Sequence, residues 1–150
     1  MGGDTTNNIK CKLMENIIYI KEFSEYPGLR HCSISDDSGE EYYHKILNNS
    51  FKSAYDKNER LIINIDFTAG YAPSFLDEAF GNLIYDFGIE EVEKRLEIIS
   101  EQEPDLKEMI LTETYPQWQE RRENDDKPKK TEKHQDWYRL IDHKLTKSNH

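Results

Sequence analysis

Residues 61–67 read LIINIDF, a short apolar run rich in isoleucine that constrains the fold more than any other stretch of the chain. A run of this length and composition is typical of a strand that is buried on both faces of a sheet. The loop TAGYAP follows, and apolar residues then recur at intervals of three and four up to Phe87. We expect a helix here that starts with Ser74 as its N-cap and ends at Gly88. A strand, a loop and an amphipathic helix in this order indicate an α/β fold.

The flanking sequence supplies further elements of the same kinds. Ser38 and Glu41 form a capping box, and the apolar positions after it predict a helix that ends near Asn58. Further segments favour three strands and two helices: strands at 16–23, 29–34 and 96–100, and helices at 89–96 and 104–115. Pro116 is expected to break or kink the second of these helices. The alternation of helices and strands predicts an α/β domain with a small mixed sheet and helices packed on it.

Two residues inside the predicted helices need a separate explanation. Gly81 costs about 1 kcal/mol relative to alanine in a helix, so some contact requires a bare backbone at this position. Close packing of another helix and the approach of a partner protein are both consistent with this. His44 lies among polar residues of its helix and is expected to be solvated.

The C-terminal region has a different character. Residues 121–136 carry no apolar periodicity and are interpreted as a polar linker. Four apolar residues then recur at helical spacing and predict an amphipathic tail helix: Trp137, Leu140, Ile141 and Leu145. This helix can dock on its own domain or on a second copy of the chain, or it can lie in a groove of another protein. We therefore divide the chain into a polar segment at 1–12, an α/β domain at 13–118, and a linker with the tail helix at 119–150.

The charge of the chain disfavours two large classes of partner. The net charge is −10, and residues 1–118 contain 11 Lys and Arg against 23 Asp and Glu, whereas residues 119–150 contain 9 against 7. A body with a net charge of −12 disfavours nucleic acid and anionic membrane surfaces. No apolar run reaches the ~20 residues that span a bilayer. The two cysteines, Cys11 and Cys32, form no metal motif and indicate free thiols in a reducing cytoplasm.

The stretch GYAPSFLDEAFGNL, residues 70–83, resembles the signature of the STAS-like domain family of unknown function. The upstream elements PGLR and SGEEYY resemble two further motifs of that family, so the resemblance covers roughly residues 27–88. It implies a fold similar to that of the anti-sigma-factor antagonists, small α/β domains that dock on a protein partner, often a kinase-like ATPase. In that group the partner phosphorylates a serine at the start of the helix after a central strand, which breaks the docking. The corresponding position is at or beside Ser74, although Ala72-Pro73-Ser74 stands in place of the usual Gly-Ser and the Asp-Ser-Ser-Gly element of the wider group is absent.

The acidic start of the predicted helix has two interpretations. In the structural one, Ser74 caps an amide while Asp77 and Glu78 place negative charge at the positive end of the helix dipole, together worth about 1–2 kcal/mol. In the functional one, Ser74 is a regulatory phosphosite whose phosphate is repelled by the two carboxylates and alters the docking surface. We expect the recognition surface to comprise six residues: Tyr71, Ser74, Phe75, Asp77, Glu78 and Asn82.

These observations favour a cytoplasmic, prokaryotic signalling domain that regulates a protein partner and has no catalytic activity, cofactor or metal. Two alternatives belong to other classes. A small-ligand or nucleotide sensor would use the helix N-terminus at 74–78 as an anion site. A metal-dependent hydrolase would hold a divalent ion through Asp66, Asp77 and Glu78, although adjacent side chains on a helix point about 100° apart.

Overall fold

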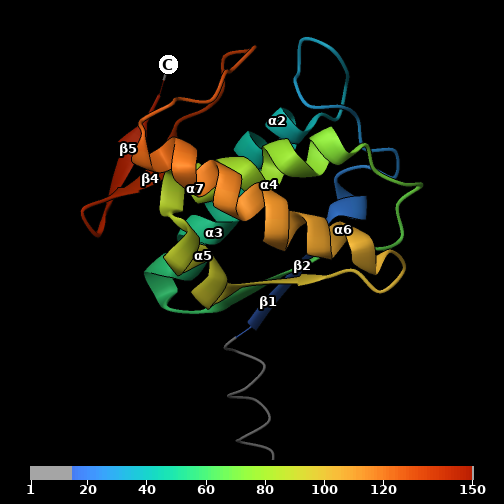
Figure 1. The fold of residues 1–150 in the computed structure, drawn as a ribbon, viewed down its shortest axis with the longest axis horizontal. Coiled ribbons are helices and arrows are strands. Elements are labelled where there is room, and N and C mark those ends of the chain that lie inside the picture. The colour runs from blue at the N-terminus through green and yellow to red at the C-terminus, as the bar shows by residue number, and fades with distance from the viewer. Residues whose placement is uncertain (1–14, 150) are drawn as a thin grey trace, which may run out of the picture.

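The computed structural model describes residues 15–149, and its main sheet contains three strands (Figure 1). In spatial order they are β1 (Glu15–Tyr19), β2 (Arg60–Asn64) and β3 (Leu96–Ile99). All neighbours are parallel, and the register pairs Ile17 with Ile62. The α/β class is confirmed, although this sheet is parallel rather than mixed among the described residues. The predicted polar segment 1–12 and Cys11 lie outside the described residues.

One predicted strand, residues 29–34, is instead a set of turns in the loop between β1 and the first long helix. The amides of Ile34 and Ser35 both donate to the carbonyl oxygen of His31, at 3.0 and 3.2 Å. The Ser35 hydroxyl accepts a hydrogen bond from the amide of Leu29 at 2.7 Å. These local bonds satisfy backbone groups that a strand would pair with a neighbour, so the prediction of a strand here is wrong.

Most helices lie where the apolar periodicity predicted them, with two π-helical turns inserted. Two differ from the prediction: residues 20–22 form a 3-10 helix inside the predicted strand 16–23, and the helix predicted to end at residue 115 continues to residue 123. In chain order they are η1 (Ile20–Glu22), α2 (Gly39–Tyr42), η2 (Tyr43–Leu47), α3 (Asn48–Lys57), α4 (Pro73–Phe87), α5 (Ile89–Arg95), α6 (Pro104–Met109), η3 (Ile110–Thr114) and α7 (Tyr115–Glu123). The Ser38 hydroxyl accepts a hydrogen bond from the amide of Glu41 at 3.0 Å, which confirms it as a helix cap. α2, η2 and α3 form one helical stretch that ends at Asn58, whose φ of 55° is left-handed.

The last helix does not end at Pro116. α6, η3 and α7 follow one another without a gap, and Pro116 is the second residue of α7. Proline lacks an amide donor, and its ring crowds the carbonyl group four residues earlier. That carbonyl belongs to Thr112 in the π-helical turn η3, whose wider spacing relieves the crowding. The predicted break is therefore absent, and the predicted boundary after residue 118 falls within α7.

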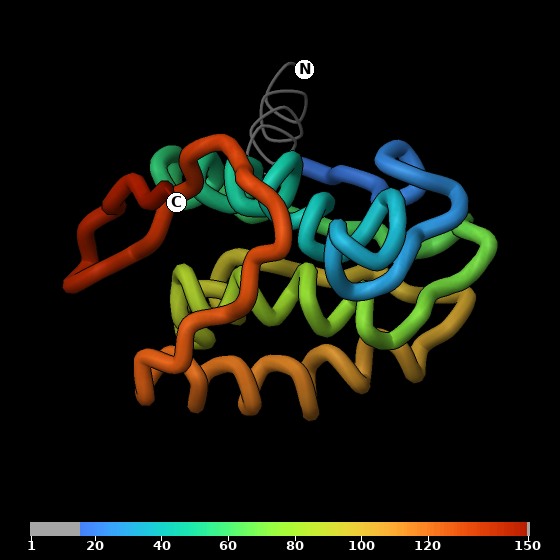
Figure 2. Tube along the Cα trace, turned by 90° about the horizontal axis from the view of Figure 1, so that it is seen from above, coloured from blue at the N-terminus to red at the C-terminus, as the bar shows by residue number. Residues whose placement is uncertain are grey.

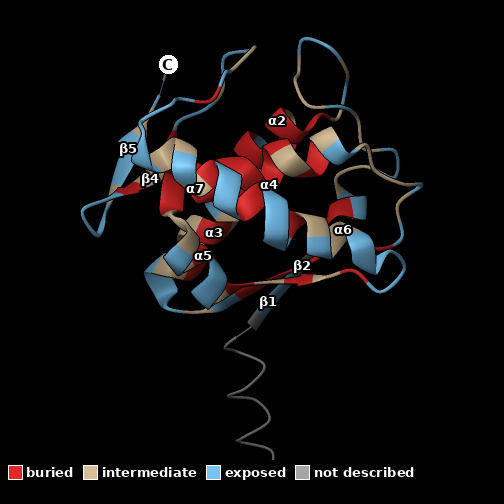
Figure 3. Ribbon diagram, viewed as in Figure 1, coloured by how far each residue is buried: buried red, intermediate tan, exposed pale blue. Residues whose placement is uncertain are grey.

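α4 is the central helix of the molecule, and every residue from Glu78 to Phe87 is buried (Figure 3). It contacts α2, α5, α7 and the C-terminal strand β4 (Trp137–Ile141). Gly81 permits the approach of α7, because a Cβ atom at this position would lie 2.1 Å from a ring atom of Trp118. The close helix packing predicted at Gly81 is therefore confirmed.

The predicted tail helix is wrong, because the C-terminal residues form an antiparallel hairpin. β4 pairs with β5 (Lys144–Ser148), and the pairing of Ile141 with Lys144 leaves a two-residue turn. Asp142 and His143 occupy this turn with φ of 52° and 65°, as type I′ hairpin turns require. Helical and strand spacing are hard to separate in so short an apolar pattern. Figure 2 shows the chain passing from α7 back across the helices to this hairpin.

We expect Gly81→Ala to destabilise the fold, because the added methyl group would collide with the buried ring of Trp118. Overpacking of this kind costs about 1–3 kcal/mol, which outweighs the ~1 kcal/mol that alanine gains over glycine in a helix. Urea unfolding followed by circular dichroism measures the loss. In a Trp118→Ala background the same substitution should be neutral or stabilising, and an equal loss there would show that the ring is not the cause.

Candidate functional site

Ser74 is the second residue of α4 and does not cap it. The helix begins at Pro73, a residue favoured at the first helical position, and its N-cap is Ala72 without a side-chain hydrogen bond. The predicted N-cap is therefore wrong by two positions. The Ser74 side chain is half-buried and makes no hydrogen bond with the described part of the chain. Its hydroxyl group is not committed to the helix end.

Asp77 holds three segments together rather than only facing the helix dipole. Its Oδ1 accepts a hydrogen bond from Thr114 Oγ1 at 2.9 Å. Its Oδ2 accepts from Trp118 Nε1 at 3.2 Å and from Arg30 Nη1 at 2.9 Å. The first two donors lie on η3 and α7, whereas Arg30 lies in the loop before α2. Ser74 and Arg30 line the same surface pocket beside Asp77.

A stripe of polar side chains is buried along α4. Glu78, Asn82 and Asp86 are spaced by four residues, and each is at most 3 % exposed. The Glu78 carboxylate accepts hydrogen bonds from Asn82 Nδ2 at 2.8 Å and from Arg30 Nη1 at 3.1 Å. A buried carboxylate is unfavourable unless it is paired and hydrogen-bonded, so Arg30 stabilises the buried position of α4. We call these three residues the polar stripe.

The structure places half of the six residues predicted as a recognition surface in the interior. Three are buried: Phe75, Glu78 and Asn82. Their side chains cannot reach a partner in this conformation. Tyr71 is half-buried, and its hydroxyl donates to the carbonyl oxygen of Ile65 at 2.7 Å. Ser74 and Asp77 keep partial exposure.

Two exposed aromatic side chains lie on loops near the carboxyl ends of β1 and β2. Tyr26 is 74 % exposed and Phe67 is 54 % exposed, on the loops that follow these two strands. A 2.8 Å hydrogen bond from the Ala69 amide to the Glu25 carbonyl oxygen holds the two loops together. Exposed apolar patches mark interaction sites, and ligands of α/β proteins bind at the carboxyl edge of the sheet. Tyr26 and Phe67, here called the docking patch, were not predicted as site residues, although Tyr26 follows a predicted strand and Phe67 ends one.

The three carboxylates considered for a metal-dependent hydrolase do not form a common site. Asp66 accepts hydrogen bonds from the backbone amides of Glu101 and Gln102, at 2.9 and 3.0 Å. Asp77 and Glu78 bond to the partners described above. In the part of the chain that the structure describes, none of the three belongs to a group of metal-binding side chains.

The C-terminal hairpin packs on its own domain. Three of the four predicted docking residues are buried or packed against the core: Trp137, Leu140 and Leu145. Ile141 is 43 % exposed. Asn48 of α3 fixes the hairpin by exchanging two hydrogen bonds of 2.9 Å with the backbone of Tyr138. The hairpin therefore packs against the core of its own chain.

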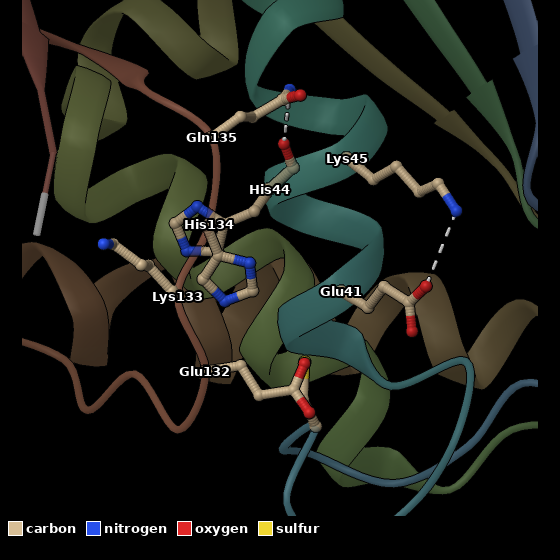
Figure 4. A pocket seen from close by; sticks show the side chains of 8 residues that line it. Glu41, His44, Lys45, Glu132, Lys133, His134 and Gln135 are labelled. Carbon is tan, nitrogen blue, oxygen red and sulfur yellow. Dashed lines mark hydrogen bonds and ion pairs between the residues drawn. The ribbon is translucent and has the colours of Figure 1, made fainter.

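A cluster that the sequence did not reveal surrounds Glu40 at the start of α2. This buried carboxylate accepts hydrogen bonds from Thr131 Oγ1 at 2.6 Å and the Cys32 amide at 3.0 Å, and it lies 2.6 Å from His134 Nε2. Burial raises the pKa of Glu40, but these contacts outweigh it and lower the pKa to about 2. His44, expected to be solvated, is buried, and its ring stacks on that of His134 with centroids 4.0 Å apart (Figure 4). Because Glu40 and His134 are 94 positions apart, no local sequence motif indicates the cluster.

Residues 38–106 match the family model of a STAS-like domain of unknown function. That segment belongs to the STAS-like family. The resemblance predicted from the sequence is confirmed, and the match runs from the cap of α2 through α4 and β3 into α6. No curated protein and no solved structure matches the chain. A STAS-like domain is compatible with a regulatory role in protein interaction. None of the described helices is both long and apolar enough to cross a membrane.

Side chains outside the STAS-like segment complete its buried polar sites. Four buried carboxylates lie within the matched residues: Glu40, Asp66, Glu78 and Asp86. Asp66 is bonded to backbone amides of the same segment. The ion-pair partners of the other three include side chains outside it: His134, Arg30 and Arg139. The flanking segments therefore take part in the charge balance of the STAS-like domain.

Asp86, the last residue of the polar stripe, is a buried carboxyl group with a raised pKa. It accepts a 2.5 Å hydrogen bond from the Tyr43 hydroxyl and lies 3.1 Å from Arg139 Nε. Burial is the largest influence and raises the pKa of Asp86 to about 6, although Tyr43 and Arg139 lower it. The folded protein therefore binds this proton more tightly than the unfolded chain does.

We expect Asp86 to make the protein less stable as the pH rises from about 4 to about 6, because a carboxyl group with a raised pKa stabilises the folded state only while it is protonated. A pKa change of this size corresponds to roughly 3 kcal/mol. The free energy of unfolding of the wild type, minus that of Asp86→Asn, should fall across this range in urea titrations. Asp142→Asn, on the exposed hairpin turn, is the control. A difference that rises with pH would contradict this interpretation.

Proposed function

We propose that the chain is a non-catalytic regulatory domain that docks on a protein partner through the docking patch and is switched by phosphorylation of Ser74. The observation that carries this proposal is that Phe67 lies in the loop between β2 and α4, and Ser74 lies in the first turn of the helix that follows this loop. The patch is exposed and aromatic, and the hydroxyl group is not used as a cap. Because the body of the chain is acidic, the partner is expected to present a basic surface. The resemblance to anti-sigma-factor antagonists implies a kinase-like ATPase.

A phosphate on Ser74 would act through Arg30. Arg30 lines the same pocket, where its Nη1 is 2.9 Å from Asp77 Oδ2. A phosphate dianion would compete with Asp77 for the guanidinium group, while Asp77 and Glu113 would repel it. Arg30 and Tyr26 share the loop between η1 and α2. Displacement of Arg30 would therefore rearrange the docking patch, which gives an off-switch for binding.

The nucleotide-sensor alternative has less support at the same place. The first residue of α4, Pro73, has no amide to donate to an anion. Asp77 and Glu113 line the adjoining pocket and would repel a phosphate group. These features favour protein docking over nucleotide binding.

Affinity measurements on the purified partner test the proposal. The partner is captured from the native host with the wild-type chain and is then titrated by calorimetry. Tyr26→Ser combined with Phe67→Ser should weaken binding at least about tenfold, or ~1.4 kcal/mol. Ser74→Glu should weaken it similarly, whereas Ser74→Ala should bind as the wild type does. Ile141→Ser replaces an apolar residue that is 43 % exposed on the hairpin, and it is the matched control.

Each result decides a separate part of the proposal. Unchanged affinity of the double variant would exclude the docking patch as the contact surface. Equal binding of Ser74→Glu and the wild type would make Ser74 a structural residue only. Mass spectrometry after incubation with the partner and ATP tests the modification itself, and an unmodified segment 70–88 would refute it.

A further inference from the structure

Cys32, Glu40 and His134 bring three metal-binding atoms together. The Cys32 sulfur, a carboxylate oxygen of Glu40 and a ring nitrogen of His134 all lie within 4.8 Å of one another. Across residues 15–149, no other group of three or more such side chains is found. The three residues come from the loop before α2, from α2, and from the segment between α7 and β4. The cluster therefore exists only in the folded chain.

Hydrogen bonds already hold these side chains in place. The Cys32 amide donates to Glu40 at 3.0 Å. Thr131 donates its amide and its hydroxyl group to the same carboxylate, at 2.9 and 2.6 Å. The His134 ring is supported by its stacking on His44 (Figure 4). Ligands that are positioned in advance lose little freedom when an ion binds.

Two carboxylates, Glu40 and Glu132, act on the cluster directly, although the pocket beside it is mixed in charge. Burial and the carboxylates of Glu40 and Glu132 raise the pKa of the Cys32 thiol to about 11, although a 3.3 Å hydrogen bond from the Ser38 hydroxyl lowers it. An adjoining open pocket of about 260 Å³ is lined by charged side chains of both signs: Glu41, Lys45, Glu132 and Lys133. The same carboxylates that disfavour a bare thiolate attract a divalent ion, which would hold the sulfur in its deprotonated form.

We propose that Cys32, Glu40 and His134 bind a divalent transition-metal ion, with zinc as the best fit. Zinc accepts sulfur, imidazole nitrogen and carboxylate oxygen in one site, whereas Mg²⁺ and Ca²⁺ prefer oxygen alone. As the metal–sulfur bond forms, the Cys32 thiol releases its proton to solvent. The proton that His134 Nε2 directs at Glu40 moves through solvent to Nδ1, so that the neutral ring binds the ion through Nε2. Cys32 and His134 line the adjoining pocket, from which water or the Glu132 carboxylate would supply a fourth ligand.

Metal binding requires a small movement of His134. Its Nε2 lies 2.6 Å from Glu40 Oε2. Two ligand atoms of a tetrahedral zinc site are roughly 3.3 Å apart, because each bond is about 2.0 Å long. His134 lies between α7 and β4, outside any helix or strand, so its ring can shift without disturbing a regular element. The ligands belong neither to the docking patch nor to the Ser74 pocket, so the site is independent of the proposed function.

Cobalt(II) titration of the full, untagged chain tests the site. In a Cys11→Ser background Cys32 is the only thiol, so a thiolate-to-cobalt charge-transfer band reports on this position. We expect one Co²⁺ per chain, displaced by Zn²⁺. Cys32→Ser should abolish the band, and His134→Asn should weaken binding at least about tenfold. His143→Asn, on the exposed hairpin turn, is the matched control and should bind as its parent does.

Two outcomes of the titration would overturn the proposal: no charge-transfer band at saturating Co²⁺, or undiminished affinity of His134→Asn. Circular dichroism of the metal-free variants shows whether they are folded. Glu40 is left unchanged, because its carboxylate anchors several donors. X-ray absorption at the zinc edge gives a second readout without the ligand substitutions. A sulfur neighbour at about 2.3 Å is expected, and neighbours of nitrogen and oxygen alone would refute the site.

Discussion

The burial of α4 is the constraint on which the rest of the fold depends. The helix carries the polar stripe into the core, and removing one partner of a buried ion pair costs roughly 3–5 kcal/mol. Arg30, from the loop before α2, and Arg139, from β4, meet the two ends of this stripe. The loop and the hairpin are therefore electrostatic requirements of the central helix. The positions of this loop and this hairpin depend on the buried charges of α4 as much as on apolar packing.

Elements that depend on local chemistry were predictable from the sequence. The isoleucine run and the cap at Ser38 carry their structural meaning within a few residues, and the cost of Gly81 in a helix indicated a close neighbour. The strand predicted at 61–67 nevertheless ends at Asn64, and Phe67 is exposed rather than buried. The hairpin was missed because its apolar spacing also fits a helix, and the left-handed turn at 142–143 and the contact with α3 decided between them. The Glu40 cluster joins residues that are 94 positions apart in the sequence. The periodicity of apolar residues does not reveal such a contact.

The motif that supports the family resemblance is largely an interior packing motif. Phe75 and Glu78 face the core, and Gly81 receives the ring of Trp118. A recognisable helix signature thus reports how the helix is packed. The exposed aromatic side chains lie on neighbouring loops, at Tyr26, just before the PGLR element, and at Phe67, the last residue of the isoleucine-rich run. For this reason the sequence indicated Ser74 as a candidate, while the surface around it became visible only in the structure.

The fit of Trp118 over Gly81 also bears on where the autonomous folding unit begins and ends. The family match stops at residue 106, before α7, and starts at residue 38, after Arg30. A recombinant fragment cut at these limits would leave one flank of α4 open to water and two buried carboxylates without a counter-charge. Such a fragment would tend to self-associate through the uncovered helix. The smallest fragment able to fold alone is therefore longer than the segment that matches the family model.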